Sequence, residues 1–376
     1  MRIQAAVLRR SPVGRPYVET EPLAIETLDL DGPGPGEVLV RIHAAGLCHS
    51  DLSVINGDRP RPLPMALGHE ASATVVETGA GVDDLAPGEG VVLVFVPSCG
   101  RCLPCAEGRA ALCEPGAAAN AAGGLLGGGR RLSGGGEPVH HHLGVSAFAD
   151  HAVVSRRSLV KAEPGLALDR AALFGCAVLT GVGAVVNTGR VTPGQSVAVV
   201  GLGGVGLSAV LGAVAAGAAR IAAVDLSPDR LAFARDLGAT DAFDARDPDC
   251  AATIRAALDG GADVAVETAG AVAAFDTAYA ATRRGGTTVS AGLANPRERL
   301  ALQQVGLVAE ERTVKGCYLG GGVPARDLPR LMRLHLQGRL PVERLMTSRG
   351  PLAGINAAFD ALAEGRTVRH LIDMAA

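Results

Sequence analysis

The sequence predicts an α/β protein with two kinds of domain, a β-rich part at the N-terminus and a doubly wound parallel sheet after it. The first observation is that short apolar runs separated by Pro/Gly turns fill the first 95 or so residues. The second is that strands alternate with helical stretches after Asp169, and this alternation is typical of a parallel sheet. With 376 residues, the chain is long enough for two or three domains.

The N-terminal part is expected to be an all-β, barrel-like lobe. The first ten residues have no long apolar region followed by a cleavage site, so they predict a first strand and not a signal peptide. Further strands are predicted at residues 37–42, 73–77 and 91–96. Residues 116–138 form a low-complexity run of Gly and Ala, which predicts a long surface loop. His140, His141 and His142 then resemble a metal-binding tract, but loop histidines are common, so we do not expect them to be ligands.

A glycine-rich turn at residues 201–206 separates an apolar run from a helical stretch. In the pattern Gly-x-Gly-x-x-Gly, Gly201 permits a tight turn, Gly203 lets the backbone approach a pyrophosphate, and Gly206 allows helix and strand to pack closely. The chain has 51 glycines, so the motif alone is weak evidence. Asp225 strengthens it, because this acidic residue ends the next strand, where a carboxylate can bind a ribose diol.

These features together predict a dinucleotide site. Asp225 favours NAD over NADP, since its charge repels a 2′-phosphate and no arginine follows it directly. Arg230 is expected along the edge of the adenosine ribose. The alternative is a domain that kept the turn and lost its ligand.

The remaining chain is predicted to complete the parallel sheet and return to the first lobe. Strands are expected at 263–267, 286–290 and 313–317, helices at 229–238 and 327–334, and a strand at the C-terminus. The expected domains are 1–177, 178–320 and a returning segment 321–376.

Composition limits the classes of function. Hydrophobic residues make up 48% and charged residues 19%, which is ordinary for a globular enzyme, and a net charge of −3 favours neither nucleic acid nor an anionic membrane as partner. No uninterrupted apolar window reaches membrane-spanning length. Eight cysteines without an export signal favour metal binding over disulfides. The expected location is the cytoplasm.

Two groups of cysteine and histidine predict metal sites. Cys99, Cys102, Cys105 and Cys113 follow the spacing C-x₂-C-x₂-C-x₇-C, which fits a closed, structural zinc site with four thiolates. Two disulfides, an iron–sulfur centre or a nucleic-acid-binding zinc ribbon are the alternatives. Cys48, His69 and Cys176 could hold a second zinc with one open position, although spacing alone does not distinguish such ligands from buried core residues.

Several motifs in one order carry a family resemblance: residues 48–51, 68–70, the four-cysteine loop, 175–176 with 180–181, 201–206 and Asp225. Over essentially its whole length the chain resembles the zinc-dependent medium-chain alcohol dehydrogenases. The loop before residues 140–144 resembles the long-loop branch, which includes the liver-type and the glutathione-dependent formaldehyde dehydrogenases. The resemblance implies a GroES-like β-rich catalytic domain and a Rossmann coenzyme domain. It also implies that copies of the chain associate as a homodimer or homotetramer.

The resemblance also implies residue roles. Cys48, His69 and Cys176 match the catalytic zinc ligands, and the four-cysteine loop matches the structural zinc ligands. Catalytic roles fall to Ser50 in proton transfer, Asp51 as the partner of His69, and Glu70 near the metal. The implied NAD contacts are His49, Thr180, Gly201, Gly203, Gly204, Val205, Gly206, Asp225, Arg230 and, at the pyrophosphate, Arg369.

The implied reaction is reversible hydride transfer between a primary or aromatic alcohol and NAD, giving an aldehyde or ketone. Two positions depart from the family pattern. Ser53 replaces a relay histidine, so we expect the proton to leave through water, and His49 replaces an arginine, so we expect weaker NAD binding. The alternatives are an S-(hydroxymethyl)glutathione dehydrogenase, for which Asp58 is the supporting residue, and a non-catalytic zinc scaffold.

Overall fold

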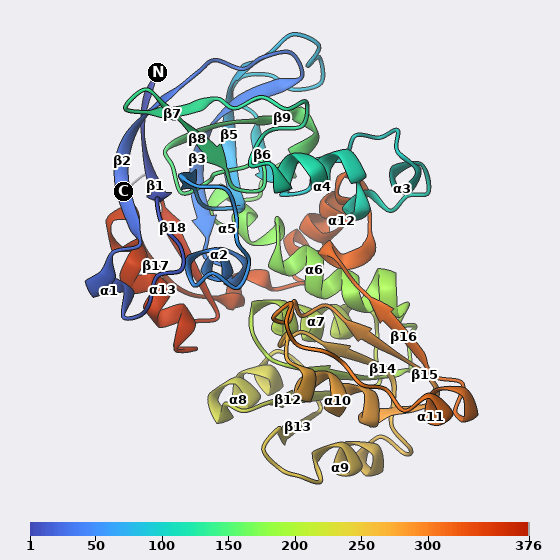
Figure 1. Cartoon of the computed structure of the whole chain (residues 1–376). Coiled ribbons are helices and arrows are strands. Elements are labelled where there is room, and N and C mark those ends of the chain that lie inside the picture. The colour runs from blue at the N-terminus through green and yellow to red at the C-terminus, as the bar shows by residue number, and fades with distance from the viewer. Residues whose placement is uncertain (375–376) are drawn as a thin grey trace. The chain divides into compact units, whose positions relative to one another are not determined.

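The computed structural model describes residues 1–374 and divides into two compact units, each described by itself here (Figure 1). The first unit comprises Met1–Cys176, Val323–Leu336 and the residues from Glu343 onward. The second comprises Ala177–Gly322 and the short piece Gln337–Val342.

The first unit contains a closed β-barrel in its N-terminal part, as the short apolar runs predict. Its strands follow the order β1 (Arg2–Leu8), β2 (Leu23–Leu30), β7 (Leu132–Gly134), β8 (Glu137–His141) and β4 (Met65–Ala66). Inward-facing apolar side chains of these strands, among them Ile3, Leu28 and Val139, form one buried core. This barrel confirms the expected β-rich lobe.

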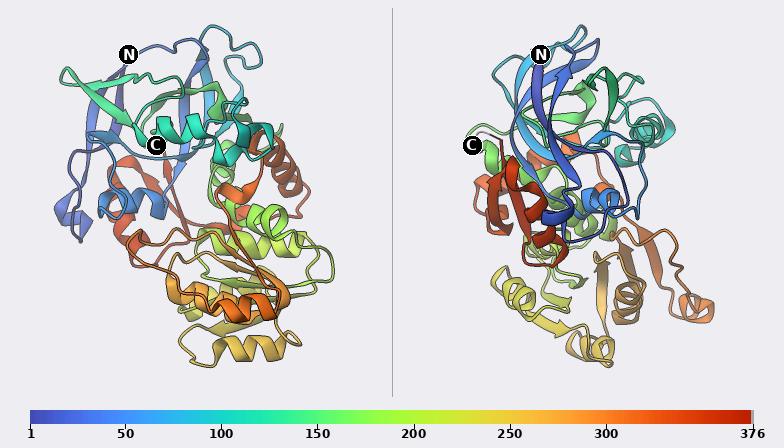
Figure 2. Two further views of the ribbon diagram at one scale, coloured as in Figure 1. Left: turned by 45° about the vertical axis from the view of Figure 1, so that its right-hand side comes forward. Right: turned by 60° about the vertical axis from the view of Figure 1, so that its left-hand side comes forward.

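A second sheet of the first unit joins segments that are far apart in sequence. Its strands are β10 (Leu159–Lys161), β6 (Gly90–Leu93), β5 (Glu70–Thr78), β3 (Glu37–Gly46), β18 (Arg369–Asp373) and β17 (Met346–Pro351), with β9 (His151–Ser155) also paired to β3. β18 runs antiparallel to β3, with Leu371 opposite Gly46. The C-terminal elements, red in Figure 2, therefore lie beside N-terminal strands, drawn in blue.

The helices of the first unit are mostly short. They are α1 (Tyr17–Thr20), α2 (His49–Ile55), α3 (Leu103–Ala106), α4 (Glu114–Ala121), α5 (Leu168–Ala171), α12 (Pro324–Leu336) and α13 (Ile355–Ala363). The helix predicted at 327–334 is the central part of α12.

The second unit is built on six strands, all paired in parallel. Their order is β13 (Asp241–Asp244), β12 (Arg220–Asp225), β11 (Ser196–Val200), β14 (Ala262–Glu267), β15 (Thr282–Ser290) and β16 (Thr313–Gly316). The helices between and around them are α6 (Ala177–Gly183), α7 (Gly204–Ala215), α8 (Pro228–Asp236), α9 (Cys250–Ala257), α10 (Val272–Ala281) and α11 (Gln304–Ala309). In sequence order the sheet reads 3-2-1-4-5-6, which is the order of the Rossmann fold.

The turn from β11 to α7 shows why two of its glycines are required. Gly201 has φ +90°, and a Cβ there would lie 2.7 Å from the backbone nitrogen of Ala269. A Cβ on Gly206 would collide with the carbonyl oxygen of Gly201. The predicted tight turn and close helix–strand packing are both confirmed.

The prediction of a long surface loop at 116–138 is wrong. α4 occupies its first part, because alanine favours helix and the Cys113 side chain caps the first turn by accepting from the Gly116 N–H. Leu125 is fully buried in the barrel core. Gly135 and Gly136, both with positive φ, then make the tight turn of the β7–β8 hairpin.

Within residues 1–374, no single helix has the length and apolar character needed to cross a membrane, and one bent pair, Leu168–Phe174 with Ala177–Gly189, meets the criterion by length and composition only.

Candidate metal centres and cofactor site

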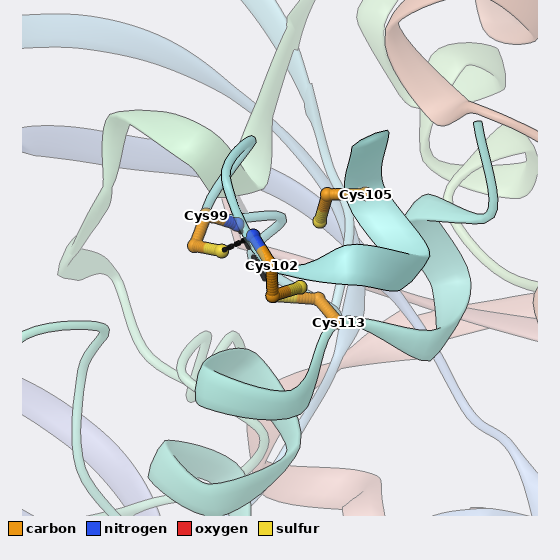
Figure 3. Close-up of side chains that lie close together, drawn as sticks. All are labelled: Cys99, Cys102, Cys105 and Cys113. Atoms are coloured by element: carbon orange, nitrogen blue, oxygen red, sulfur yellow. Dashed lines mark hydrogen bonds between the residues drawn. The ribbon is translucent and has the colours of Figure 1, made fainter. Parts of the chain in front are cut away.

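The four-cysteine loop brings its sulfur atoms together, all within 4.8 Å of one another. Figure 3 shows the side chains converging from the segment before α3, from α3 itself and from the residue that precedes α4. The Cys99 N–H donates to Cys113 Sγ over 3.1 Å, and the Cys102 N–H donates to Cys99 Sγ over 3.4 Å. Backbone donors of this kind stabilise thiolates, and those of Arg101 and Cys102 lower the pKa of Cys99 to about 6.

All eight cysteines lie among the described residues and carry free thiols. The two-disulfide alternative for the loop therefore has no support, whereas four clustered sulfurs fit the tetrahedral geometry that zinc prefers. Because no position in such a ligand set stays open, an ion held here would have a structural role.

The second group, Cys48, His69 and Cys176, also converges, although its members come from three distant segments of the first unit. Cys48 follows β3 and precedes α2, His69 directly precedes β5, and Cys176 ends the first of the three segments that make up this unit. Their ligand atoms lie within 4.8 Å of one another, and all three side chains are buried. A donor set of two sulfurs and one imidazole nitrogen with a free fourth position suits a catalytic zinc.

The state of His69 supports metal binding by a separate observation. Its Nε2 is buried and has no hydrogen-bond partner, whereas its Nδ1 lies 3.1 Å from Asp51 Oδ1. A buried imidazole nitrogen without a partner costs free energy unless something binds it. The two thiols interact as a pair, since a hydrogen bond from Cys176 lowers the pKa of Cys48 and raises that of Cys176.

Asp51, on α2, is completely buried among polar partners. Its Oδ1 accepts from the Gly68 N–H over 3.2 Å and faces His69. Burial alone would raise the pKa of this carboxyl, but the neighbouring His69 and His142 lower it. The carboxylate is thus held in its ionised form beside the imidazole.

Glu70 and Arg369 are expected near the metal and at a pyrophosphate, respectively, and the structure places them in contact. Arg369 donates through Nη2 to Glu70 and through Nη1 to the Leu47 carbonyl over 3.0 Å. The arginine occupies this place because β18 pairs with β3. The pyrophosphate contact of Arg369 stays a prediction.

The remaining predicted residues of α2 lie at its first turns. The Ser50 N–H donates to Cys48 Sγ over 3.5 Å, His49 is exposed, and Ser53 Oγ donates to the His49 carbonyl over 2.8 Å. Ser53 is therefore engaged with its own helix.

The predicted cofactor residues of the second unit lie on the turn between β11 and α7 and on the elements β12, α6 and α8. Asp225 ends β12, and its carboxylate accepts from the Leu202 N–H over 2.6 Å and from the Ser227 N–H over 2.9 Å. Gly203 is the N-cap residue of α7, Gly204 and Val205 begin the helix, and all three are half-buried. Thr180 is buried within α6, and Arg230 lies in the first turn of α8.

Comparisons with known proteins identify the family. A family model described as "Alcohol dehydrogenase GroES-like domain" matches residues 34–164, and one described as "Zinc-binding dehydrogenase" matches residues 204–337. The NDMA-dependent alcohol dehydrogenase of Amycolatopsis methanolica is 38% identical over 376 residues, covering 99% of each chain. The chain belongs to the zinc-dependent medium-chain alcohol dehydrogenase family.

Two solved structures of the family have closely similar folds. An alcohol dehydrogenase zinc-binding domain protein from Burkholderia ambifaria is 36% identical, covers 99% of both chains and has a TM-score of 0.93. The benzyl alcohol dehydrogenase of Acinetobacter calcoaceticus is 31% identical over all of both chains, also with a TM-score of 0.93. The expected combination of a GroES-like and a Rossmann domain is confirmed, and the assignment to the long-loop branch stays a prediction.

Sequence reasoning missed two histidines of this dehydrogenase. The tract 140–142 is not in a loop, because β8 includes His140 and His141, and His142 follows directly. His141 is buried and accepts from the Arg131 N–H through Nε2 over 3.1 Å, and His142 lies 3.1 Å from Asp51. Strand alternation could have revealed His141, which lies two residues after the buried Val139 on the same face.

Proposed function

We propose that this oxidoreductase oxidises primary or aromatic alcohols to aldehydes or ketones, reversibly, with NAD as hydride acceptor. The observation that carries the proposal is the convergence of Cys48, His69 and Cys176 around a buried imidazole nitrogen without a partner. A non-catalytic scaffold would need neither this open ligand set nor the carboxylate of Asp51 behind it.

These three residues would hold one zinc ion, which would act as a Lewis acid on the oxygen of the alcohol. Asp51 orients the His69 ring by accepting a hydrogen bond from its Nδ1, so that Nε2 faces the two thiols. Ser50 carries a hydroxyl that can accept one proton and donate another, which suits proton transfer away from the alcohol. Ser53 has no basic group, so we infer that the proton continues through water.

The four-cysteine loop would hold a second, structural zinc. Its four sulfurs leave no position for a substrate, so its contribution would be to the stability of residues 99–113. A scaffold that kept only this site would contain about one zinc per chain, whereas the enzyme would contain about two.

NAD would supply the acceptor carbon for the hydride and would bind at the β11–α7 turn. Asp225 supports NAD over NADP, because its carboxylate stands at the end of β12 where the adenosine ribose would lie. The exposed His49, in place of an arginine, would hold the pyrophosphate less firmly.

Aromatic or primary alcohols are the substrates we propose, and the related benzyl alcohol dehydrogenase supports this class by its name. Glutathione adducts are less favoured as substrates, because Asp58 is the single residue of the sequence that supports binding of their charged groups.

The test is NADH formation, measured by its near-ultraviolet absorbance, with purified protein, NAD and a panel of short, long and aromatic alcohols. Turnover of plain alcohols supports the proposal. Turnover only with formaldehyde plus glutathione would move the chain to the formaldehyde branch. Because one relative is named NDMA-dependent, a parallel series uses NDMA as acceptor, and alcohol turnover in that series alone would contradict the role of free NAD.

We also propose that the protein is a homodimer or homotetramer joined through its Rossmann sheets. β16 is the last strand in the sheet order and pairs with β15 on one side. In α11, which precedes β16 in sequence, Val305 and Val308 are 65% and 68% exposed, which is unusual for valine. Light scattering coupled to gel filtration would contradict this proposal if it gave the mass of one chain.

A further inference from the structure

The carboxylate of Asp51 faces two imidazoles. His69 Nδ1 and His142 Nδ1 both lie 3.1 Å from the same oxygen, Oδ1. All three side chains are buried, with exposed fractions of 0%, 0% and 1%. His142 follows β8, a strand that is remote in sequence from both α2 and β5.

The contact of His142 is close but not aligned. His69 forms a hydrogen bond with Oδ1, whereas His142 Nδ1 forms none at the same distance, and Asp51 Oδ2 has no partner either. Two neighbouring buried polar atoms without partners each cost about 1–3 kcal/mol. A small rotation of the carboxylate or of the imidazole would pair them, so the arrangement favours a hydrogen bond from His142 to Asp51.

The chemistry of the two groups fits a hydrogen bond from His142 to Asp51. An imidazole has an N–H to donate, and a carboxylate accepts. The buried carboxylate already accepts from the Gly68 N–H at Oδ1, and His142 would add a further donor to it.

His142 also contacts the ring of His69. The two rings meet edge to face, with centroids 5.4 Å apart and planes at 88°. Phe95 meets His69 in the same way, at 5.1 Å and 88°. The orientation of His69 therefore depends on one carboxylate and two rings, and His142 acts on it both directly and through Asp51.

We propose that His142 is a positioning residue for the catalytic zinc site: it donates a hydrogen bond to Asp51 and so holds His69 in its metal-binding orientation. This inference rests on the proposed zinc ligands Cys48, His69 and Cys176. The outer partners of a metal-binding histidine typically change metal affinity by about 10- to 100-fold, and His142 acts one contact further out, so its effect should lie near the lower end.

The experiment measures the rate at which zinc leaves the zinc-loaded protein into a chelator, dipicolinate, with total zinc determined alongside. The zinc of the four-cysteine loop is an internal control in every sample. The Cys48→Ser protein, which should hold only that zinc, identifies which kinetic phase belongs to which site.

Two substitutions distinguish the effect of the His142 ring from the effect of its N–H donor. His142→Phe keeps a ring and removes the N–H, and it should release the catalytic zinc about tenfold faster. His142→Asn keeps an amide N–H close to the position of Nδ1, and its release rate should return to within about threefold of the wild type. The structural zinc should leave at an unchanged rate in both.

A double-mutant cycle distinguishes positioning from packing. In an Asp51→Ala background, which has no acceptor for the His142 N–H, His142→Phe should cause no further acceleration. An equal acceleration in both backgrounds, an unchanged rate in His142→Phe, or a parallel loss of both zinc ions with a lower melting temperature would overturn the inference. If His142→Phe does not fold, the zinc release rates of His142→Asn and His142→Ala are compared instead, and only His142→Ala should release the catalytic zinc faster.

The two proposals fail differently. A Cys48→Ser protein that keeps both zinc ions would contradict the proposed active site and, with it, the role of His142. A Cys48→Ser protein that loses one zinc, combined with an unchanged release rate in His142→Phe, would contradict the role of His142 alone.

Discussion

Arg369 Nη2 donates a hydrogen bond to a carboxylate oxygen of Glu70, and the two side chains are 4% and 0% exposed. This ion pair joins β18, at the C-terminus, to β5, beside the metal ligand candidate His69. Burial would lower the pKa of Arg369, but Glu70 and the nearby thiols of Cys48 and Cys176 raise it. The guanidinium therefore balances the charge of the buried Glu70 carboxylate.

Removing one partner of this pair should destabilise the protein strongly. Arg369→Met leaves the Glu70 carboxylate buried without its counterion, and the expected loss is about 3–5 kcal/mol in the free energy of unfolding. Urea unfolding of the zinc-loaded protein measures it. The matched control is Arg9→Met, because Arg9 pairs with Glu26 at the surface, where such a pair contributes about 0–1 kcal/mol. Equal losses in the two variants would contradict the account.

Loss of one structural thiol should remove one metal ion and loosen one loop. Cys113→Ser is expected to lower the zinc content by about one equivalent per chain and to make residues 99–113 more sensitive to protease. The control is Cys250→Ser, since Cys250 is buried in the second unit and belongs to neither metal group. A Cys113→Ser protein with its full zinc content would show that this loop is not a zinc site.

The carboxylate of Asp225 should select between the two nicotinamide cofactors. Asp225→Ser removes the charge that would repel a 2′-phosphate, and the ratio of kcat/KM for NAD to that for NADP should fall by about 10- to 100-fold. Asp229→Ser removes an equal charge from the exposed first turn of α8 and should leave the ratio unchanged. Steady-state kinetics with both cofactors measure the effect, and an unchanged ratio in Asp225→Ser would refute it.

His141 should make stability depend on pH below neutrality. Burial lowers its pKa to about 3, from 6.5 in an exposed histidine. Between pH 6.5 and 3, His141 is therefore protonated in the unfolded chain but neutral in the folded chain. Stability is complete above pH 6.5 and falls as the pH drops towards 3, by about 1.4 kcal/mol per pH unit. His141→Gln should remove this part of the slope in urea unfolding between pH 6.5 and 4. Parallel curves for the two proteins would disprove it.

The features that the sequence predicts well are local. The turn from β11 to α7 needs only its own glycines and the apolar run before it, and the four cysteines lie within one short loop, so spacing alone indicates their chemistry. Asp225 belongs to the next strand of the same motif.

The features that the sequence does not predict depend on distant partners. Leu125 and the β7–β8 hairpin are ordered because β2 and β4 complete the barrel around them, and a Gly/Ala-rich segment carries little sign of that. Arg369 meets Glu70 only through the pairing of β18 with β3. His142 is close to Asp51 only because β8 pairs with β4, and no local sequence pattern predicts this pairing.

The most direct test of the central claim compares wild-type protein with Cys48→Ala in zinc content and in alcohol-dependent NADH formation, with Cys250→Ser as the control. If Cys48, His69 and Cys176 hold the zinc at which alcohols react, Cys48→Ala loses about one zinc per chain and at least about a thousandfold in turnover, while residues 99–113 keep their metal. A Cys48→Ala protein that loses this zinc and still oxidises alcohols at the wild-type rate would contradict the account.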